Sequence, residues 1–130
     1  MSGKGGFVMD TFNWLVIGHL VGDWLLQNDW MAKGKKRGLI TTPGLVHYTI
    51  YTIAVVTFLW LSPENTVGLG LYLIVGGIIF LTHWIIDSTK FVEYWIQTFK
   101  QSNISIMRIM VDQTFHILVL ALIAYVILVA

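Results

Sequence analysis

The sequence of 130 residues contains no cysteine and few charged residues. Without cysteine, the chain has no disulfide, no thiolate metal ligand and no cysteine nucleophile. Charged residues make up 12% of the chain, which is about half of their share in a typical soluble domain. The net charge of +1 gives no indication of a nucleic-acid partner, and we expect none.

The chain is rich in apolar residues. Hydrophobic residues make up 56% of it, and the mean hydropathy is +0.74. The apolar runs are long enough to cross a bilayer, which takes about 20 residues each. We therefore predict one domain over residues 1–130, folded as an all-α integral membrane bundle of four transmembrane helices. The four predicted spans are residues 9–32, 43–61, 67–89 and 105–130.

Two further expectations concern the last two predicted spans. Segment 91–99 spaces Phe91, Trp95 and Phe99 four residues apart, so it either forms a short helix in the membrane interface or extends the third span. Four glycines of the third span are expected to allow close helix approach. They are Gly68, Gly70, Gly76 and Gly77.

The positive charge is concentrated in loops. Four basic residues lie within positions 33–37, and Lys90, Lys100 and Arg108 lie around the last loop, whereas the loop between the second and third spans has only Glu64. By the positive-inside rule, the basic loops are cytoplasmic and both termini lie outside. The predicted location is a multi-pass protein of the bacterial inner membrane, in contact with membrane lipid and able to form a homo-oligomer.

Three histidines are each four residues from an aspartate inside these apolar spans. The pairs are His19 with Asp23, His83 with Asp87, and Asp112 with His116; His47 is the fourth histidine. Residues four apart share a helix face, and an unpaired charge buried in an apolar span costs several kcal/mol. Because all seven side chains fall in the cytoplasmic half of the predicted bundle, we expect them to converge on one site.

Imidazole and carboxylate ligands together suit a divalent metal ion, zinc first and iron or manganese as alternatives. The predicted primary ligands are Asp23, His83, Asp112 and His116, and His47 is a further metal ligand. His19 and Asp87 are predicted catalytic residues, although each could instead bind a second metal or orient a ligand. The alternative is that the pairs are buried hydrogen-bonded pairs that hold the helices together.

Four other polar residues are candidates for substrate binding. Lys90 and Arg108 lie at the cytoplasmic mouth, where they could hold a phosphate or an anionic lipid head group. Gln27 and Gln113 could orient a substrate or satisfy the site by hydrogen bonding. The loop-charge signal explains Lys90 and Arg108 equally well.

The stretches HLVGDWLLQNDWMAKGK (residues 19–35), HWIIDSTK (83–90) and DQTFH (112–116), with the single His47, resemble a family of small bacterial membrane proteins described only as a domain of unknown function. The resemblance covers nearly the whole chain and implies a four-helix integral membrane fold. More loosely, HWIID is similar to the histidine–aspartate box of membrane-bound metal-dependent hydrolases.

These observations predict a metal-dependent intramembrane enzyme, a hydrolase that acts on a lipid or another phosphate-bearing amphiphile from the cytoplasmic side. Two alternatives remain open. Intramembrane His/Asp chains also form ion pathways, so the protein could transport a metal ion or protons. It could also be an accessory subunit in which the His/Asp cluster is only structural.

Overall fold

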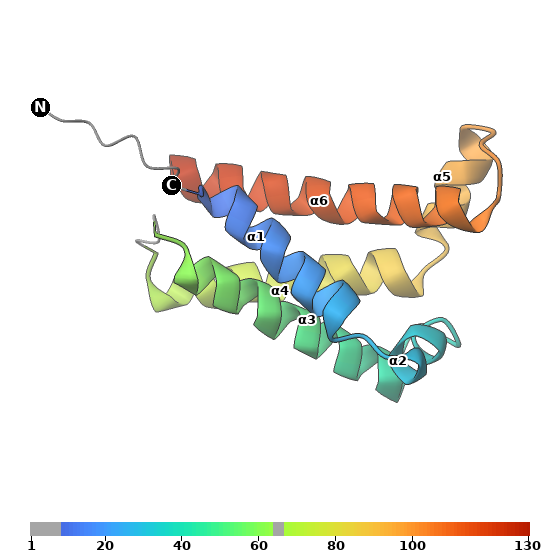
Figure 1. Cartoon of the computed structure of the whole chain (residues 1–130), viewed down its shortest axis with the longest axis horizontal. Coiled ribbons are helices and arrows are strands. Elements are labelled where there is room, and N and C mark those ends of the chain that lie inside the picture. Colours follow the sequence, from blue (N-terminus) through green and yellow to red (C-terminus); the bar gives the residue numbers. More distant parts are fainter. Residues whose placement is uncertain (1–8, 64–66) are drawn as a thin grey trace, which may run out of the picture.

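The computed structural model describes residues 9–63 and 67–130, and every regular element within these residues is helical (Figure 1). The all-α prediction is therefore confirmed. Glu64, on which part of the topology argument depends, lies outside the described residues. The elements, in chain order, are α1 (Thr11–Leu20), the π-helical turn η1 (Val21–Leu25), α2 (Asp29–Gly34), α3 (Thr42–Leu61), α4 (Leu69–Ser88), α5 (Phe91–Thr98) and α6 (Ser105–Val129).

The prediction of a single N-terminal span over residues 9–32 is wrong. The carboxylate of Asp10 accepts a hydrogen bond from the Asn13 N–H (2.9 Å) and starts α1. The helix widens into η1 and ends there, and Asn28 then caps α2 by accepting from the Met31 N–H (3.0 Å). In the part of the chain that the structure describes, three helices rather than four are long and apolar enough to cross a membrane, namely α3, α4 and α6.

The other predicted spans are close to the observed helices. At the start of α3, the Thr41 hydroxyl accepts from the Gly44 N–H (3.1 Å), and Pro43 occupies the first turn, where its missing N–H costs nothing. The segment that follows α4 is a separate short helix, α5. Phe91 and Trp95 of α5 pack on Phe115 of α6, with ring centroids 4.7 and 4.9 Å apart.

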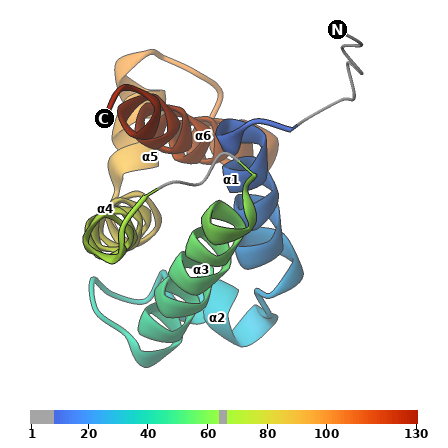
Figure 2. The same ribbon diagram turned by 90° about the vertical axis from the view of Figure 1, so that its left-hand side faces the viewer.

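Helix α1 crosses α3 and α6, and its path is allowed by glycine (Figures 1 and 2). A Cβ atom on Gly18 would lie 2.9 Å from the Val55 Cα, and one on Gly22 would lie 3.0 Å from the Tyr51 Cα. The expected role of the four glycines in the third predicted span is wrong. A Cβ atom on Gly68, Gly70 or Gly77 would meet nothing within 4 Å. A Cβ atom on Gly76 would make only ordinary van der Waals contacts.

The interior is divided into an apolar half and a polar half. The apolar core lies toward the end of the bundle that holds the start of α1 and the C-terminus (Figure 1). It consists of Leu15, Tyr51, Val55, Leu59, Val75, Ile79, Leu120 and Ile123. Outside this core, α4 and α6 expose large apolar side chains, for example Leu73 (70% exposed) and Leu122 (64% exposed). Such exposure suits lipid contact. The polar half lies toward α2 and α5.

Candidate metal centre

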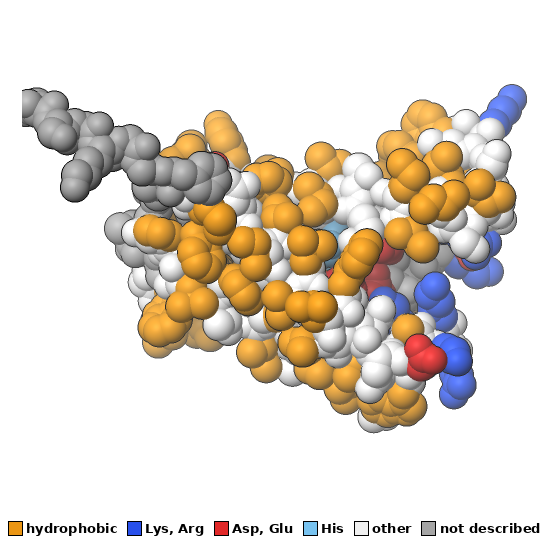
Figure 3. Space-filling model, in the orientation of Figure 1, with side chains coloured by type: hydrophobic (Ala, Val, Ile, Leu, Met, Phe, Trp, Pro, Cys, Tyr) orange, Lys and Arg blue, Asp and Glu red, His pale blue; other side chains and the backbone are white. Residues whose placement is uncertain are grey.

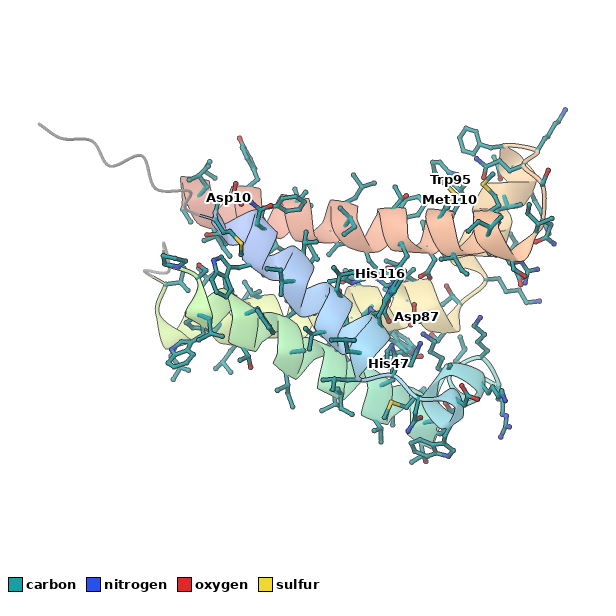
Figure 4. The ribbon with its side chains drawn as sticks, in the orientation of Figure 1. Asp10, His47, Asp87, Trp95, Met110 and His116 are labelled. Atoms are coloured by element: carbon teal, nitrogen blue, oxygen red, sulfur yellow. The ribbon has the colours of Figure 1, made fainter. Side chains whose placement is uncertain are left out.

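The polar half contains all seven predicted His and Asp side chains, and they lie close together. We call this set the His/Asp cluster: His19, Asp23, His47, His83, Asp87, Asp112 and His116. Its members come from α1, η1, α3, α4 and α6, so the bundle itself assembles the cluster. Figure 4 labels His47, Asp87 and His116 where these helices meet. The predicted convergence on one site is confirmed.

Four members of the cluster form a compact group. The Nε2 atoms of His47 and His83 are 2.9 Å apart. The His47 Nε2 lies 3.2 Å from Asp23 Oδ1 and 3.4 Å from Asp87 Oδ2, and the His83 Nε2 lies 3.7 and 3.2 Å from the same two oxygens. All four side chains are at most 5% exposed.

These distances fit the ligand shell of a small divalent ion. One ligand atom from each of the four residues lies within 4.8 Å of the other three. Ligands about 2.0–2.1 Å from a tetrahedral zinc ion are separated by about 3.3 Å, and the observed distances of 2.9–3.7 Å bracket that value. Asp23 Oδ1 has no hydrogen-bond partner among the described residues, so this buried oxygen is available to a cation.

A second group adjoins the first. The His116 Nε2 lies 3.1 Å from Asp87 Oδ1 and 3.6 Å from Asp112 Oδ2. Asp23, Asp112 and His116 also offer ligand atoms within 4.8 Å of one another. The Asp112 side chain is 27% exposed, which makes it the most accessible of the three carboxylates.

Gln113 connects the two groups. Its amide nitrogen donates to Asp23 Oδ2 (3.0 Å) and Asp112 Oδ2 (2.9 Å). Its amide oxygen therefore faces the His19 Nε2 (2.7 Å) and the Trp24 indole N–H (3.1 Å). Since an amide oxygen only accepts hydrogen bonds, the His19 Nε2 carries a proton and the His19 Nδ1 accepts from the Tyr51 hydroxyl (2.9 Å).

Both ring nitrogens of His19 are thus engaged in hydrogen bonds, and His19 is fully buried. The catalytic role of His19 stays a prediction. In the structure, His19 contacts Gln113 and helps to orient it. The Nδ1 atoms of His47 and His83 lack a hydrogen-bond partner within residues 9–63 and 67–130. Packing holds the His83 ring, because Tyr51 stacks on it at 3.7 Å with an interplanar angle of 14°.

Lys35 is a site residue that the sequence pattern did not predict. Its Nζ atom lies 2.5 Å from Asp87 Oδ2, and its side chain is 10% exposed. Lys35 belongs to the basic tract that the positive-inside rule uses to predict topology, and no helical spacing links it to the cluster. Lys35 directly follows α2, and the packing of α2 against α3 places it beside the cluster.

A cavity of about 880 Å³ opens beside the cluster. The four predicted substrate-binding residues line it, together with all three cluster carboxylates: Gln27, Lys90, Arg108 and Gln113 with Asp23, Asp87 and Asp112. Lys36 and Arg37 add positive charge, and Trp24, Leu39 and Ile109 add apolar wall. Figure 3 shows this region as a hollow with acidic side chains inside and Lys and Arg side chains near it.

The fold and the site define a class: a small all-helical protein with three helices of membrane-crossing length and a buried His/Asp cluster. Residues 11–130 match the family described as "Protein of unknown function (DUF3307)", so the chain belongs to that family. The family membership expected from the sequence is confirmed. No curated protein and no solved structure matches the chain.

Proposed function

We propose that the His/Asp cluster binds a divalent metal ion. The observation that carries this proposal is the convergence of two imidazole nitrogens and two carboxylate oxygens from η1, α3 and α4. The N–N and N–O distances among them are 2.9–3.7 Å, and all four atoms lie within 4.8 Å of one another. Mixed nitrogen and oxygen donors favour zinc, with iron or manganese as alternatives. Tetrahedral ligands are separated by about 3.3 Å and neighbouring octahedral ligands by about 3.0 Å, so the distances alone do not choose between these ions.

Metal analysis of the purified protein tests this proposal. After expression with added zinc or manganese, we expect at least one ion per chain in the wild type and near-complete loss in His47→Ala. Asp29→Asn, which removes an exposed carboxylate of α2 that does not line the cavity, should keep the wild-type metal content. Metal-free wild-type protein, together with a lowered melting temperature of His47→Ala, would instead favour a purely structural cluster.

The finer proposal is that the metal centre belongs to a hydrolase for a lipid or another phosphate-bearing amphiphile. A bound divalent ion lowers the pKa of its water toward neutrality and polarises a phosphoryl oxygen. The supporting feature is the cavity, in which the cluster carboxylates, basic side chains and apolar wall lie together. In this proposal Lys90 and Arg108 hold the anionic head group, and His19 positions Gln113 rather than touching the substrate.

The carboxylates that line the cavity give the released proton an acceptor. Asp112 is the most exposed of them, and its Oδ2 already accepts from Gln113. Gln27 has a buried side-chain oxygen with no hydrogen-bond partner in the described part of the chain, so it can accept a hydrogen bond from a substrate. Arg108 contacts Glu93 (3.8 Å) and Asn103 (2.6 Å), and these contacts hold it at the cavity.

Release of inorganic phosphate from vesicles of phosphatidic acid and phosphatidylcholine is the corresponding test. We expect Lys90→Gln to raise KM by about 10–100-fold with a smaller effect on kcat, because a hydrogen bond to a charged group is worth about 1.5–3 kcal/mol. Lys100→Gln is the matched control, since Lys100 does not line the cavity. If the two variants have equal kinetics, Lys90 does not contribute to substrate binding.

Ion transport is less well supported than hydrolysis. A pathway across the membrane needs polar groups along its whole length, but the half of the bundle beyond the cluster is filled by the apolar core, including Val55, Ile79 and Leu120. Metal flux into liposomes, measured beside phosphate release, separates the two functions.

A further inference from the structure

We infer that the His/Asp cluster is a two-metal centre in which the Asp87 carboxylate bridges the two ions. This inference rests on the proposed metal site and adds a second ion at His116 and Asp112. It also narrows the substrate to one with a phosphoryl dianion.

The two oxygens of Asp87 face different histidines. Oδ2 lies 3.4 Å from the His47 Nε2 and 3.2 Å from the His83 Nε2. Oδ1 lies 3.1 Å from the His116 Nε2. A carboxylate placed in this way can bind one ion through each oxygen, and two-metal hydrolytic centres hold their ions about 3.5–4 Å apart. The His83 and His116 rings are adjacent, with centroids 4.4 Å apart. Their nitrogen atoms can therefore bind two neighbouring ions, one at each histidine.

The second position has its own donors. Asp112 Oδ2 lies 3.6 Å from the His116 Nε2, and Asp23 offers a ligand atom to this group as well as to the first. The buried Oδ1 of Asp23 has no hydrogen-bond partner among the described residues, whereas Gln113 donates to its Oδ2. Asp87 and Asp23 are thus the two carboxylates common to both positions.

The net charge of the cluster indicates what kind of substrate would accompany a second ion. The cluster holds three carboxylates, from Asp23, Asp87 and Asp112, and its close contacts within the described residues include one ammonium, from Lys35. With neutral imidazoles, these groups carry a net charge of −2. One divalent ion neutralises the cluster, and a second leaves an excess of +2 that a phosphoryl dianion would balance. Because Asp112 is the most exposed carboxylate, the second ion should bind more weakly and should be retained when phosphate is present.

Manganese titration monitored by electron paramagnetic resonance, with and without inorganic phosphate, tests the inference. We expect the wild type in detergent to bind two Mn²⁺ per chain. Phosphate should lower the second dissociation constant at least about tenfold, and the two ions should give a spin-coupled signal. Asp112→Asn and His116→Ala should each bind one uncoupled Mn²⁺, and Asp87→Asn should lose both.

The possible results separate this inference from the proposed function. No bound Mn²⁺ in the wild type would overturn both. One ion in the wild type, unchanged in Asp112→Asn, would overturn the two-metal centre and leave the single site standing. Two ions in Asp112→Asn and in His116→Ala would also contradict the assignment. If His116→Ala does not fold, the nearly isosteric Asp112→Asn decides, with circular dichroism melting as the folding control.

Discussion

Asp87 is the residue on which the contacts of the cluster converge. Its carboxylate lies within 3.4 Å of three imidazole nitrogens and 2.5 Å from the Lys35 ammonium. The ammonium and a metal ion at the first position would share the same oxygen, Oδ2. If the cluster binds a metal ion as proposed, Lys35 would compete with that ion for Asp87, and removing Lys35 should tighten metal binding.

We expect Lys35→Met to tighten binding of the first metal ion by at least about tenfold. The substitution removes one positive charge beside a divalent ion, and a charge pair about 4 Å apart is worth a few kcal/mol at an effective dielectric constant of about 20. Isothermal titration with Zn²⁺ or Mn²⁺ measures the effect. Lys33→Met is the matched control, because the Lys33 side chain is 74% exposed and, within the described part of the chain, forms an ion pair with Asp29 rather than with the cluster. Weaker binding in Lys35→Met would mean that Lys35 holds Asp87 in place for the metal.

At the scale of single residues, the cluster was predictable and Lys35 was not. His83 and Asp87 could be recognised because a titratable pair four residues apart in an apolar run is costly to bury and is rare without a partner or a function. The engagement of both His19 nitrogens depends on Tyr51 and Gln113, which come from other helices. Contacts of this kind depend on how the helices pack, and residue spacing does not encode them.

At the scale of elements, the N-terminal region decides the geometry of the site. A π-helical turn contains an extra residue and is frequent at functional sites. Here η1 contains both Gly22, which allows close contact with α3, and Asp23, which enters the cluster. The lengths of α3, α4 and α6 follow from apolar runs that the sequence displays. The division of the first run into α1, η1 and α2 depends on packing and on capping by Asn28, so composition alone predicted a single span.

We expect Gly18→Ala to destabilise the protein by about 1–3 kcal/mol, the usual cost of overpacking. The added methyl would lie 2.9 Å from the Val55 Cα and 3.0 Å from the Phe58 Cβ, so α1 must move away from α3. Gly77→Ala is the matched control, since it has open space and gains up to about 1 kcal/mol of helix propensity. Thermal melting in detergent measures both. Equal melting temperatures would show that α1 and α3 do not pack as closely as the structure has them.

At the scale of the whole molecule, the two ends differ in charge and in polarity. The start of α1 and the C-terminus lie at one end of the bundle, and α2 and α5 lie at the other (Figure 1). Lys and Arg side chains gather at the α2 and α5 end (Figure 3). The cavity is lined by residues of that end, and the apolar core lies between the cluster and the opposite end. If the bundle spans a membrane, the His/Asp cluster is reached from one side only.

The positive-inside rule predicts that this side is the cytoplasm. The chain has no cysteine, so in intact cells each single-cysteine variant has one labelling site and the wild-type chain has none. Lys36→Cys and Lys100→Cys should resist an impermeant maleimide until the membrane is opened, because both lie in the basic loops. Asn13→Cys and Ala130→Cys, at the opposite end, should react in intact cells. Reaction of Lys36→Cys and Ala130→Cys from the same side would contradict the crossing by α3, α4 and α6. Complete inversion of the labelling pattern would be compatible with the fold but would place the cavity outside the cell. A cytoplasmic substrate could not then reach the His/Asp cluster.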